Sequence, residues 1–345
     1  MKKRIIVSVC AILVLAAVFA ISTALVRPKY TDSTQLEGRI IGEYYDEAGG
    51  HDVIFIGDCE VYESFVPAVM WEEYGISSYI RGSAQQLVWH SYYLLEETFK
   101  YESPKAVVFN VLALKYGEPQ SEAYNRMTLD GMRWSESKAQ AIAKSMTAEE
   151  SFLDYVFPLL RYHSRITELS ADDFKYAFSE PEAVSHSGYL MQTNIVPMPE
   201  GDAQGIPTSD TLPDSAMEYL EKIRLLCEEN GAELILIKAP TNSWRYWWYD
   251  HWDEQICEYA EEKSLAYYNF IPLCEEIGID WSTDTYDAGL HLNVYGAEKL
   301  SVYFGDILAK NHGITDRRGD DALSERWQGR VEKFYNDKNL RESKQ

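Results

Sequence analysis

The stretch VIFIGDCE, residues 53–60, decides the fold class of this chain. Its first five residues, 53–57, are uncharged and bounded by polar residues, which is typical of a short buried strand that ends in a turn. A helix is predicted next, because Pro67 stands near its start and Gly75 at its end. A buried strand followed by a turn and a helix is the unit from which parallel α/β sheets are built.

The same alternation of strand and helix continues along the chain. Further strands are predicted at 76–80, 106–112, 233–237 and 265–271, and further helices at 85–99, 214–230, 254–263 and 294–310, the last with Asn293 as N-cap. The pattern predicts an α/β fold of three layers, in which a five-stranded, mostly parallel sheet has helices on both faces.

The α/β domain is expected to cover residues 51–312, after a linker and first turn at 28–50. An insertion at 116–212 separates the third and fourth strands. It should contain helices at 135–146, 148–166 and 171–178, followed by a long loop at 179–212. Pro158 is expected to kink the second of these helices.

Residues 313–345 read as a charged C-terminal tail. Trp327, Val331 and Phe334 recur there at helical spacing, so a docked surface helix is an alternative for this segment.

The amino terminus, residues 1–27, is predicted to be a signal anchor that spans a membrane. Residues 5–26 carry no charge over 22 positions, and a bilayer needs about 20 apolar residues. Basic residues at 2–4 place the amino terminus in the cytoplasm and the rest of the chain outside, as a single-pass protein of the cell membrane. A cleaved signal peptide, with small residues at Ser22 and Ala24, is the alternative; it would leave a secreted domain.

Composition excludes several classes of function. The chain has 55 acidic against 32 basic residues, a formal net charge of −23, so we expect no nucleic-acid partner. It has no Cys-x-x-Cys pair, no dinucleotide-binding glycine pattern and no P-loop, so we expect no metal site and no cofactor. Cys227, Cys257 and Cys274 are either buried apolar residues or include one disulfide.

The residues that could carry chemistry stand where parallel strands end. Sites in α/β sheets form at the carboxyl ends of the strands. Cys59 follows the first strand, and His291 precedes the last helix with Asp284 and Asp287 nearby. A nucleophile, a histidine and an acid that orients the histidine are what acyl transfer requires. Asp287 is the first choice for the orienting acid because it is nearer to His291.

These motifs resemble the SGNH/GDSL hydrolase family over roughly residues 50–312, and the resemblance implies a flavodoxin-like sheet. Gly57-Asp58-Cys59 is similar to the family's first conserved block. The stretch from Asp287 through His291 is similar to its last block. Gly82 and Asn110 match the positions whose backbone N–H and side chain stabilise the oxyanion. The chain is especially similar to the membrane-anchored, extracytoplasmic branch found in Gram-positive bacteria, which is related to proteins of teichoic-acid D-alanylation and polysaccharide O-acetylation.

Two departures from the family pattern bear on activity. The family's serine is Cys59 here; a thiol is a competent nucleophile when its pKa falls, but a site that binds without turnover is the alternative. The family's Asp-x-x-His is lengthened, since three residues separate Asp287 from His291.

An aromatic segment, residues 244–252, follows the fourth predicted strand. Its Trp244, Trp247 and Trp248 could stack on sugar rings of a cell-surface glycan or polymer. The alternatives are a lid over the site and a surface in the membrane interface.

Two hypotheses follow. In the first, the chain is an esterase or acyltransferase acting on ester-linked acyl groups of cell-surface polysaccharide. In the second, it is an inactive binding protein or partner of a membrane-bound O-acyltransferase.

Overall fold

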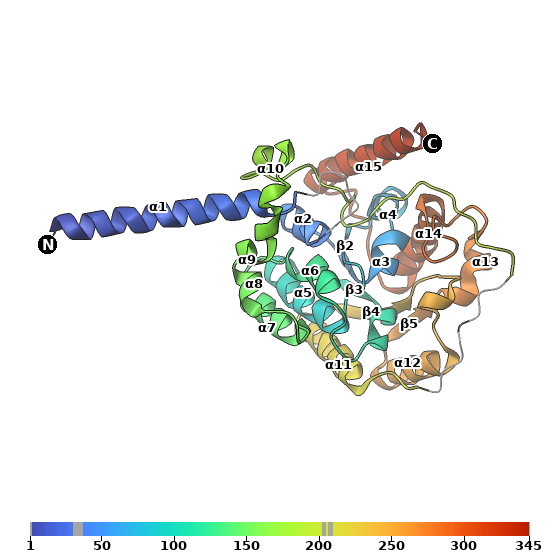
Figure 1. Cartoon of the computed structure of the whole chain (residues 1–345). Helices are drawn as coiled ribbons and strands as arrows, with labels where there is room; N and C mark the ends of the chain where they lie inside the picture. The colour runs from blue at the N-terminus through green and yellow to red at the C-terminus, as the bar shows by residue number, and fades with distance from the viewer. Residues whose placement is uncertain (1, 30–36, 202–204, 206–209, 345) are drawn as a thin grey trace. The chain divides into compact units, whose positions relative to one another are not determined.

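The computed structural model describes residues 2–29, 37–201, 205 and 210–344, and these form two compact units (Figure 1). The larger unit consists of Glu37–Ser145 and Ser185–Gln345, and the smaller one of Met1–Leu36 and Met146–Val184. The insertion expected at 116–212 is therefore divided, and only its middle part belongs to the smaller unit.

The larger unit is built on one sheet of five parallel strands, which confirms the predicted α/β class. The strands are β1 (Val53–Gly57), β2 (Ser78–Gly82), β3 (Ala106–Asn110), β4 (Glu233–Lys238) and β5 (Ala266–Asn269). Their order is β2-β1-β3-β4-β5, and every neighbouring pair is parallel. The order reverses between β1 and β3, and ligand sites of such sheets lie at the carboxyl ends of the strands beside this reversal.

Helices cover both faces of the sheet (Figure 1). On one side α14 (Val294–Asn311) packs against α3 (Cys59–Ser64) and α4 (Pro67–Tyr74); on the other, α5 (Val88–Tyr101) packs against α11 (Asp214–Glu229) and α7 (Glu136–Ser145). The remaining helices of the unit are α2 (Arg39–Glu47), α6 (Glu122–Leu129), α12 (Asp250–Lys263), α13 (Cys274–Ile277) and α15 (Asp321–Glu342), with 3₁₀ turns η1 (Val111–Lys115), η3 (Trp244–Tyr246) and η4 (Ile271–Leu273). Asn293 caps α14 as predicted, accepting hydrogen bonds from the backbone N–H groups of Tyr295 and Gly296.

Segments on either side of the predicted domain also pack on its core. Helix α2 lies within the expected linker at 28–50, and its Tyr44 is fully buried. Helix α15 lies within the expected tail: Trp327 is fully buried and stacks on Trp71 of α4, with ring centroids 5.3 Å apart. Residues 30–36 of the expected linker lie outside the described residues.

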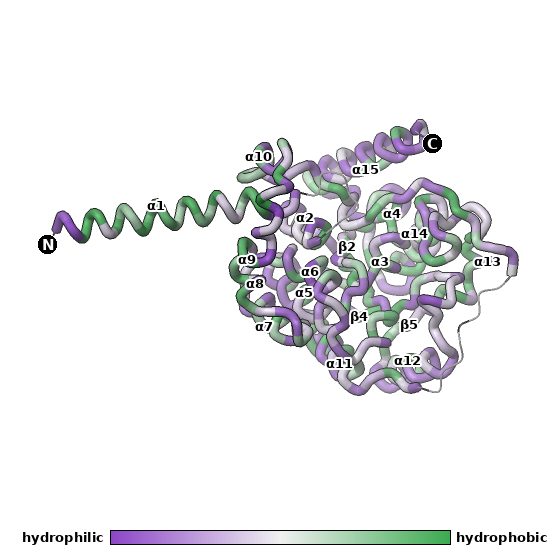
Figure 2. Tube along the Cα trace, viewed as in Figure 1, coloured by the Kyte–Doolittle hydropathy of each residue, from purple (hydrophilic) through white to green (hydrophobic). Residues whose placement is uncertain are grey.

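The smaller unit contains α1 (Lys2–Val26) and the short helices α8 (Phe152–Val156), α9 (Pro158–Tyr162), η2 (His163–Thr167) and α10 (Ala171–Lys175). The helix expected at 148–166 is broken rather than kinked, because Pro158, which cannot donate a helical hydrogen bond, begins α9. Helix α1 is apolar along nearly its whole length (Figure 2), and it is the one helix among the described residues long and apolar enough to cross a membrane. A membrane anchor and a signal sequence are both consistent with it.

Part of the expected long loop at 179–212 is held against the larger unit by backbone hydrogen bonds. The N–H of Leu190 donates to the carbonyl of Tyr62, and the N–H of Val196 donates to the carbonyl of Thr285. The cysteines are all free. This segment thus connects the chain after β1 to the chain before α14, the two places that carry the candidate chemistry.

Candidate active site

Cys59 is the first residue of α3, directly after the turn that ends β1. Asp58 caps the helix by accepting a hydrogen bond from the N–H of Glu60. The turn requires glycine at position 57, because a Cβ atom there would lie 2.6 Å from Cγ2 of Val61 and 3.0 Å from Cβ of Asn110. The result is a buried thiol, 4% exposed, at the start of a helix beside the reversal of strand order.

His291 is held by Asp287 through two hydrogen bonds. Its backbone N–H donates to Asp287 Oδ1 at 2.8 Å, and its ring Nδ1 lies 2.7 Å from Asp287 Oδ2. The lengthened spacing is accommodated because Ala288 and Gly289 both adopt left-handed backbone, with φ of 64° and 91°. Asp284 lies elsewhere: its carboxylate accepts from Lys299 Nζ at 2.6 Å and from the N–H of Asp280.

The Cys59 thiol and the His291 ring interact electrostatically. Burial raises the pKa of the Cys59 thiol, and the interaction with His291 opposes that rise. Burial alone would lower the pKa of His291, but the nearby Glu63, Cys59 and Asp287 together hold it well above its ordinary value. Nε2 of His291 is buried and has no hydrogen-bond partner in the described part of the chain. A protonated imidazole beside a thiol stabilises the thiolate.

A second carboxyl group, from Glu63, also faces His291, and the sequence reasoning missed it. Its Oε2 atom lies 3.3 Å from His291 Nδ1, and its Oε1 atom accepts a hydrogen bond from the Tyr286 hydroxyl at 2.9 Å. The Tyr286 ring is nearly parallel to the His291 ring, with centroids 5.9 Å apart. Burial raises the pKa of Glu63 to about 7. The helical spacing could have revealed it, since residues four apart share a helix face and Glu63 follows Cys59 by four.

Asn110 lies beneath the turn that carries Cys59. Its Nδ2 amide donates to Asp58 Oδ1 at 3.0 Å and to Glu60 Oε2 at 2.9 Å, while its Oδ1 accepts from the N–H of Ala239. The fully buried Lys238 donates to both carboxylate oxygens of Glu60 at 2.8 Å. These bonds fix the turn, and they engage both amide hydrogens that the expected oxyanion role of Asn110 requires.

Gly82 ends β2 directly opposite Gly57 in the sheet register. A Cβ atom at Gly82 would lie 3.3 Å from the backbone oxygen of Asp58 and 3.2 Å from Cδ1 of Tyr62. The end of β2 therefore closely approaches the turn before Cys59, and only a residue without a side chain fits there without displacement.

The aromatic segment places a tyrosine, rather than a tryptophan, against the thiol. Cys59 Sγ lies 3.5 Å from the Tyr246 hydroxyl, and the Tyr246 ring meets the His291 ring edge to face at 5.3 Å. Trp244 is exposed, Trp247 is half-buried, and Trp248 is buried with its indole N–H bonded to Asp253. Sequence spacing alone does not show which ring of the segment turns inward, because Ser243 sets this by capping η3.

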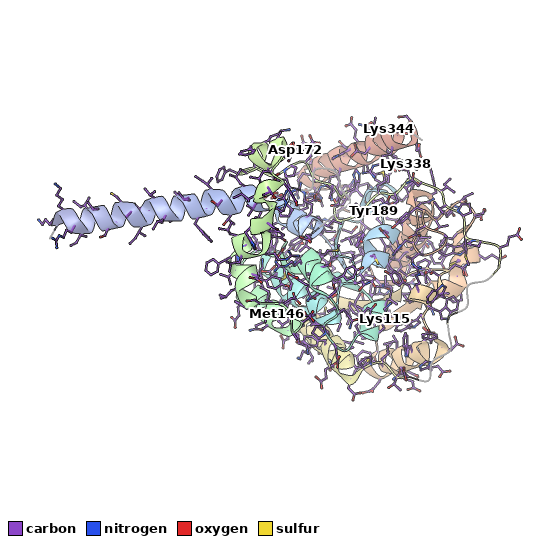
Figure 3. All side chains as sticks on the ribbon, in the orientation of Figure 1. Lys115, Met146, Asp172, Tyr189, Lys338 and Lys344 are labelled. Carbon is purple, nitrogen blue, oxygen red and sulfur yellow. The ribbon has the colours of Figure 1, made fainter. Side chains whose placement is uncertain are left out.

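A cation completes the surroundings of Cys59. Lys115, labelled in Figure 3, is the last residue of η1. Its ammonium lies 4.6 Å from the centroid of the Tyr246 ring. Burial lowers the pKa of Lys115, and the neighbouring Asp58, Glu60 and Cys59 oppose this. Among the described residues no cluster of histidine, cysteine and carboxylate side chains could hold a metal ion.

No protein-family model and no curated protein matches the chain. Among solved structures, the chain is similar to a presumed acylhydrolase from Bacteroides fragilis NCTC 9343, with a TM-score of 0.38 and 10% sequence identity. The match covers 82% of this chain and 99% of that one.

Proposed function

We propose that the larger unit is an esterase or acyltransferase in which Cys59 is the nucleophile, His291 the general base and acid, and Asp287 the residue that orients His291. The observation that carries the proposal is that a thiol at a helix N-terminus interacts with a histidine whose Nδ1 is hydrogen-bonded to a carboxylate. With Nδ1 so engaged, Nε2 is the nitrogen left to exchange a proton.

The reaction proceeds by two acyl transfers. The proton of Cys59 resides on His291, so Sγ attacks the carbonyl carbon of an ester as a thiolate, and collapse of the tetrahedral intermediate breaks the ester C–O bond. The departing alkoxide takes that proton and leaves as an alcohol, so an acyl thioester remains on Cys59. Water or a sugar hydroxyl then gives its proton to His291 and attacks the thioester carbon, and the C–S bond breaks. Cys59 and His291 thereby return to the thiolate and the imidazolium.

The oxyanion needs donors that point at the former carbonyl oxygen. We assign this role to the backbone N–H of Gly82 and to the hydroxyl of Tyr246. The Tyr246 hydroxyl lies 3.5 Å from Cys59 Sγ, and once the sulfur is bonded to the substrate carbon it no longer carries the charge that would attract the Tyr246 proton, so that proton is available to the substrate. Asn110 remains a third candidate, but it would first have to release a carboxylate partner. Removing one such donor typically costs about 10²–10³ in kcat.

The substrate we propose is an ester-linked acyl group on a cell-surface polysaccharide. The resemblance to polysaccharide O-acetylation proteins supports this, as does the exposed Trp244 beside the site, with the half-buried Trp247. We further propose that α1 anchors the chain in the cell membrane with the larger unit outside. A membrane-bound O-acyltransferase is the proposed partner.

Acylation of Cys59 tests the function directly. The full chain in detergent is incubated with p-nitrophenyl acetate, and intact-mass and peptide mass spectrometry follow acetyl transfer. We expect an acetyl adduct on Cys59, its absence in Cys59→Ala, and no change in Cys257→Ala, which removes an exposed thiol outside the site. Ester turnover by Cys59→Ala equal to that of the original chain would overturn the proposal.

A non-catalytic binding role is the second candidate, and the burial of Cys59 favours it, since burial raises the pKa of the thiol. Cys59→Ser separates the two functions. An intact catalytic set gives the serine variant esterase activity, whereas a binding protein shows neither acylation nor turnover with either residue.

A further inference from the structure

The smaller unit exposes large apolar side chains at a density that the larger unit does not approach. Outside α1, six of them are at least 40% exposed within residues 153–178: Leu153, Phe157, Leu160, Ile166, Phe174 and Phe178. The most exposed, Phe178, shows 77% of its surface. Soluble surfaces rarely gather apolar residues in this way, and such patches mark sites of contact with proteins or membranes.

These side chains belong to helices that contact α1. The ring of Phe157 packs edge to face on Phe19, with centroids 5.9 Å apart. The guanidinium of Arg165 donates to the backbone oxygen of Val26 at 2.6 Å and binds Asp173 with its other nitrogen. The short helices are thus tied to the C-terminal turns of α1.

The contact with Phe19 fixes the depth of the short helices relative to the apolar helix. Phe19 precedes Val26 by seven residues, which is about 10 Å along a helix. The 22 uncharged residues 5–26 match the roughly 30 Å of bilayer hydrocarbon. If α1 fills that thickness, Phe157 lies several ångströms inside the hydrocarbon boundary, the depth at which interfacial helices bury their apolar faces.

We propose that α8 to α10 form a collar around the outer end of α1 and insert their exposed apolar side chains into the lipid bilayer. The inference rests on α1 spanning the membrane and is independent of the chemistry at Cys59. Arg161 and Lys175 lie over the rings of Tyr162 and Tyr176, and such pairs of an amphipathic ring and a cation are suited to the headgroup layer.

The bilayer is favoured over a protein partner because the apolar surface continues directly from α1, which is itself exposed along its length. The segment 146–184 carries three basic residues and eight acidic ones, and Asp172, labelled in Figure 3, is one of the acidic residues. Attraction to anionic headgroups is therefore not the driving force. Insertion by apolar area alone predicts that neutral phosphatidylcholine is sufficient.

Photocrosslinking in a bilayer tests the proposal. The full chain is reconstituted into phosphatidylcholine nanodiscs, with p-benzoylphenylalanine introduced singly at Ile166 or Phe178. Ile12 of α1, 64% exposed, is the positive control, and Leu225 of α11, 42% exposed, is the matched control in the larger unit. After irradiation, mass spectrometry identifies adducts with lipid, and gel electrophoresis identifies adducts with a second chain.

We expect lipid adducts at Ile12, Ile166 and Phe178 and none at Leu225. Lipid adducts at Ile12 without any at Ile166 and Phe178 would overturn the proposal, as would chain-to-chain adducts at these two positions, which would identify a protein interface. Absence of lipid adducts at Ile12 would show that α1 does not span the bilayer, and it would overturn the proposal because the collar depends on that span. Acetylation of Cys59 is measured on the same samples, so a failure of the collar and a failure of the enzymatic proposal are distinguished.

Discussion

Replacing Glu63 by Gln should lower the pKa of His291 while leaving the shape of the site intact. The carboxylate oxygen lies 3.3 Å from His291 Nδ1, where a unit charge stabilises the imidazolium by up to about 5 kcal/mol at an effective dielectric constant of about 20. Solvent and neighbouring groups compensate part of this loss, and opposite charges at such distances shift pKa values by about one to three units. We expect a fall in that range.

The measurement is an NMR titration of the full chain labelled with ¹³Cε1-histidine. The chain has seven histidines, and the His291 signal is assigned by its loss in His291→Gln. Asp287→Asn should lower the same pKa, because that carboxylate is bonded to the same ring nitrogen at 2.7 Å. Glu73→Gln, which removes an exposed charge on α4, is the matched control.

A change of the His291 pKa in Glu63→Gln no larger than in Glu73→Gln would refute the inference that the Glu63 carboxylate raises the pKa of His291. The other six histidine signals report whether the variant is folded. The direction of this pKa change also predicts a change in reactivity. When the pKa of His291 is lower, the imidazolium that stabilises the thiolate is lost at lower pH, so the rate of Cys59 alkylation near neutral pH should fall.

Three further changes probe the site and its support. Tyr246→Phe should lower kcat of ester turnover about 10²-fold with little change in KM, if its hydroxyl donates to the oxyanion; equal kcat would exclude that role. Gly57→Ala should destabilise the fold by about 1–3 kcal/mol, because its Cβ would meet Val61 at 2.6 Å; an unchanged denaturation midpoint would contradict the close approach. Lys238→Met should destabilise the fold by about 3–5 kcal/mol, because it leaves Glu60 buried without its cation. Combining Lys238→Met with Glu60→Leu should recover part of this loss, as measured by thermal unfolding. A purely steric defect would show no such recovery.

The sheet was predictable because its strands are short apolar runs whose burial requires no knowledge of distant contacts. Residues 53–57 and 106–110 are strands in both the sequence interpretation and the structure. The positions of Cys59 and His291 were also predictable, because parallel strands bring their carboxyl ends to one edge. The second predicted strand was displaced by two residues, since β2 begins at Ser78 rather than at residue 76.

The remaining features depend on contacts between residues far apart in sequence. The engagement of Asn110 follows from three groups in two distant segments: Asp58 and Glu60 after β1, and the N–H of Ala239 after β4. The inward turn of Tyr246 depends on the conformation of η3, which the aromatic composition of residues 244–252 does not reveal. The division of the insertion into two units likewise reflects packing of residues 146–184 with α1.

The stacking of Trp327 on Trp71 has a consequence for the order in which the fold can be completed. The two rings belong to helices at opposite ends of the larger unit's sequence, so their contact closes a loop of more than 250 residues. Such a contact forms late, because the entropy of closing a long loop must be overcome first. Until α15 has been synthesised, one face of α4 stays uncovered, and a chain terminated early presents that indole to solvent or to quality-control proteases.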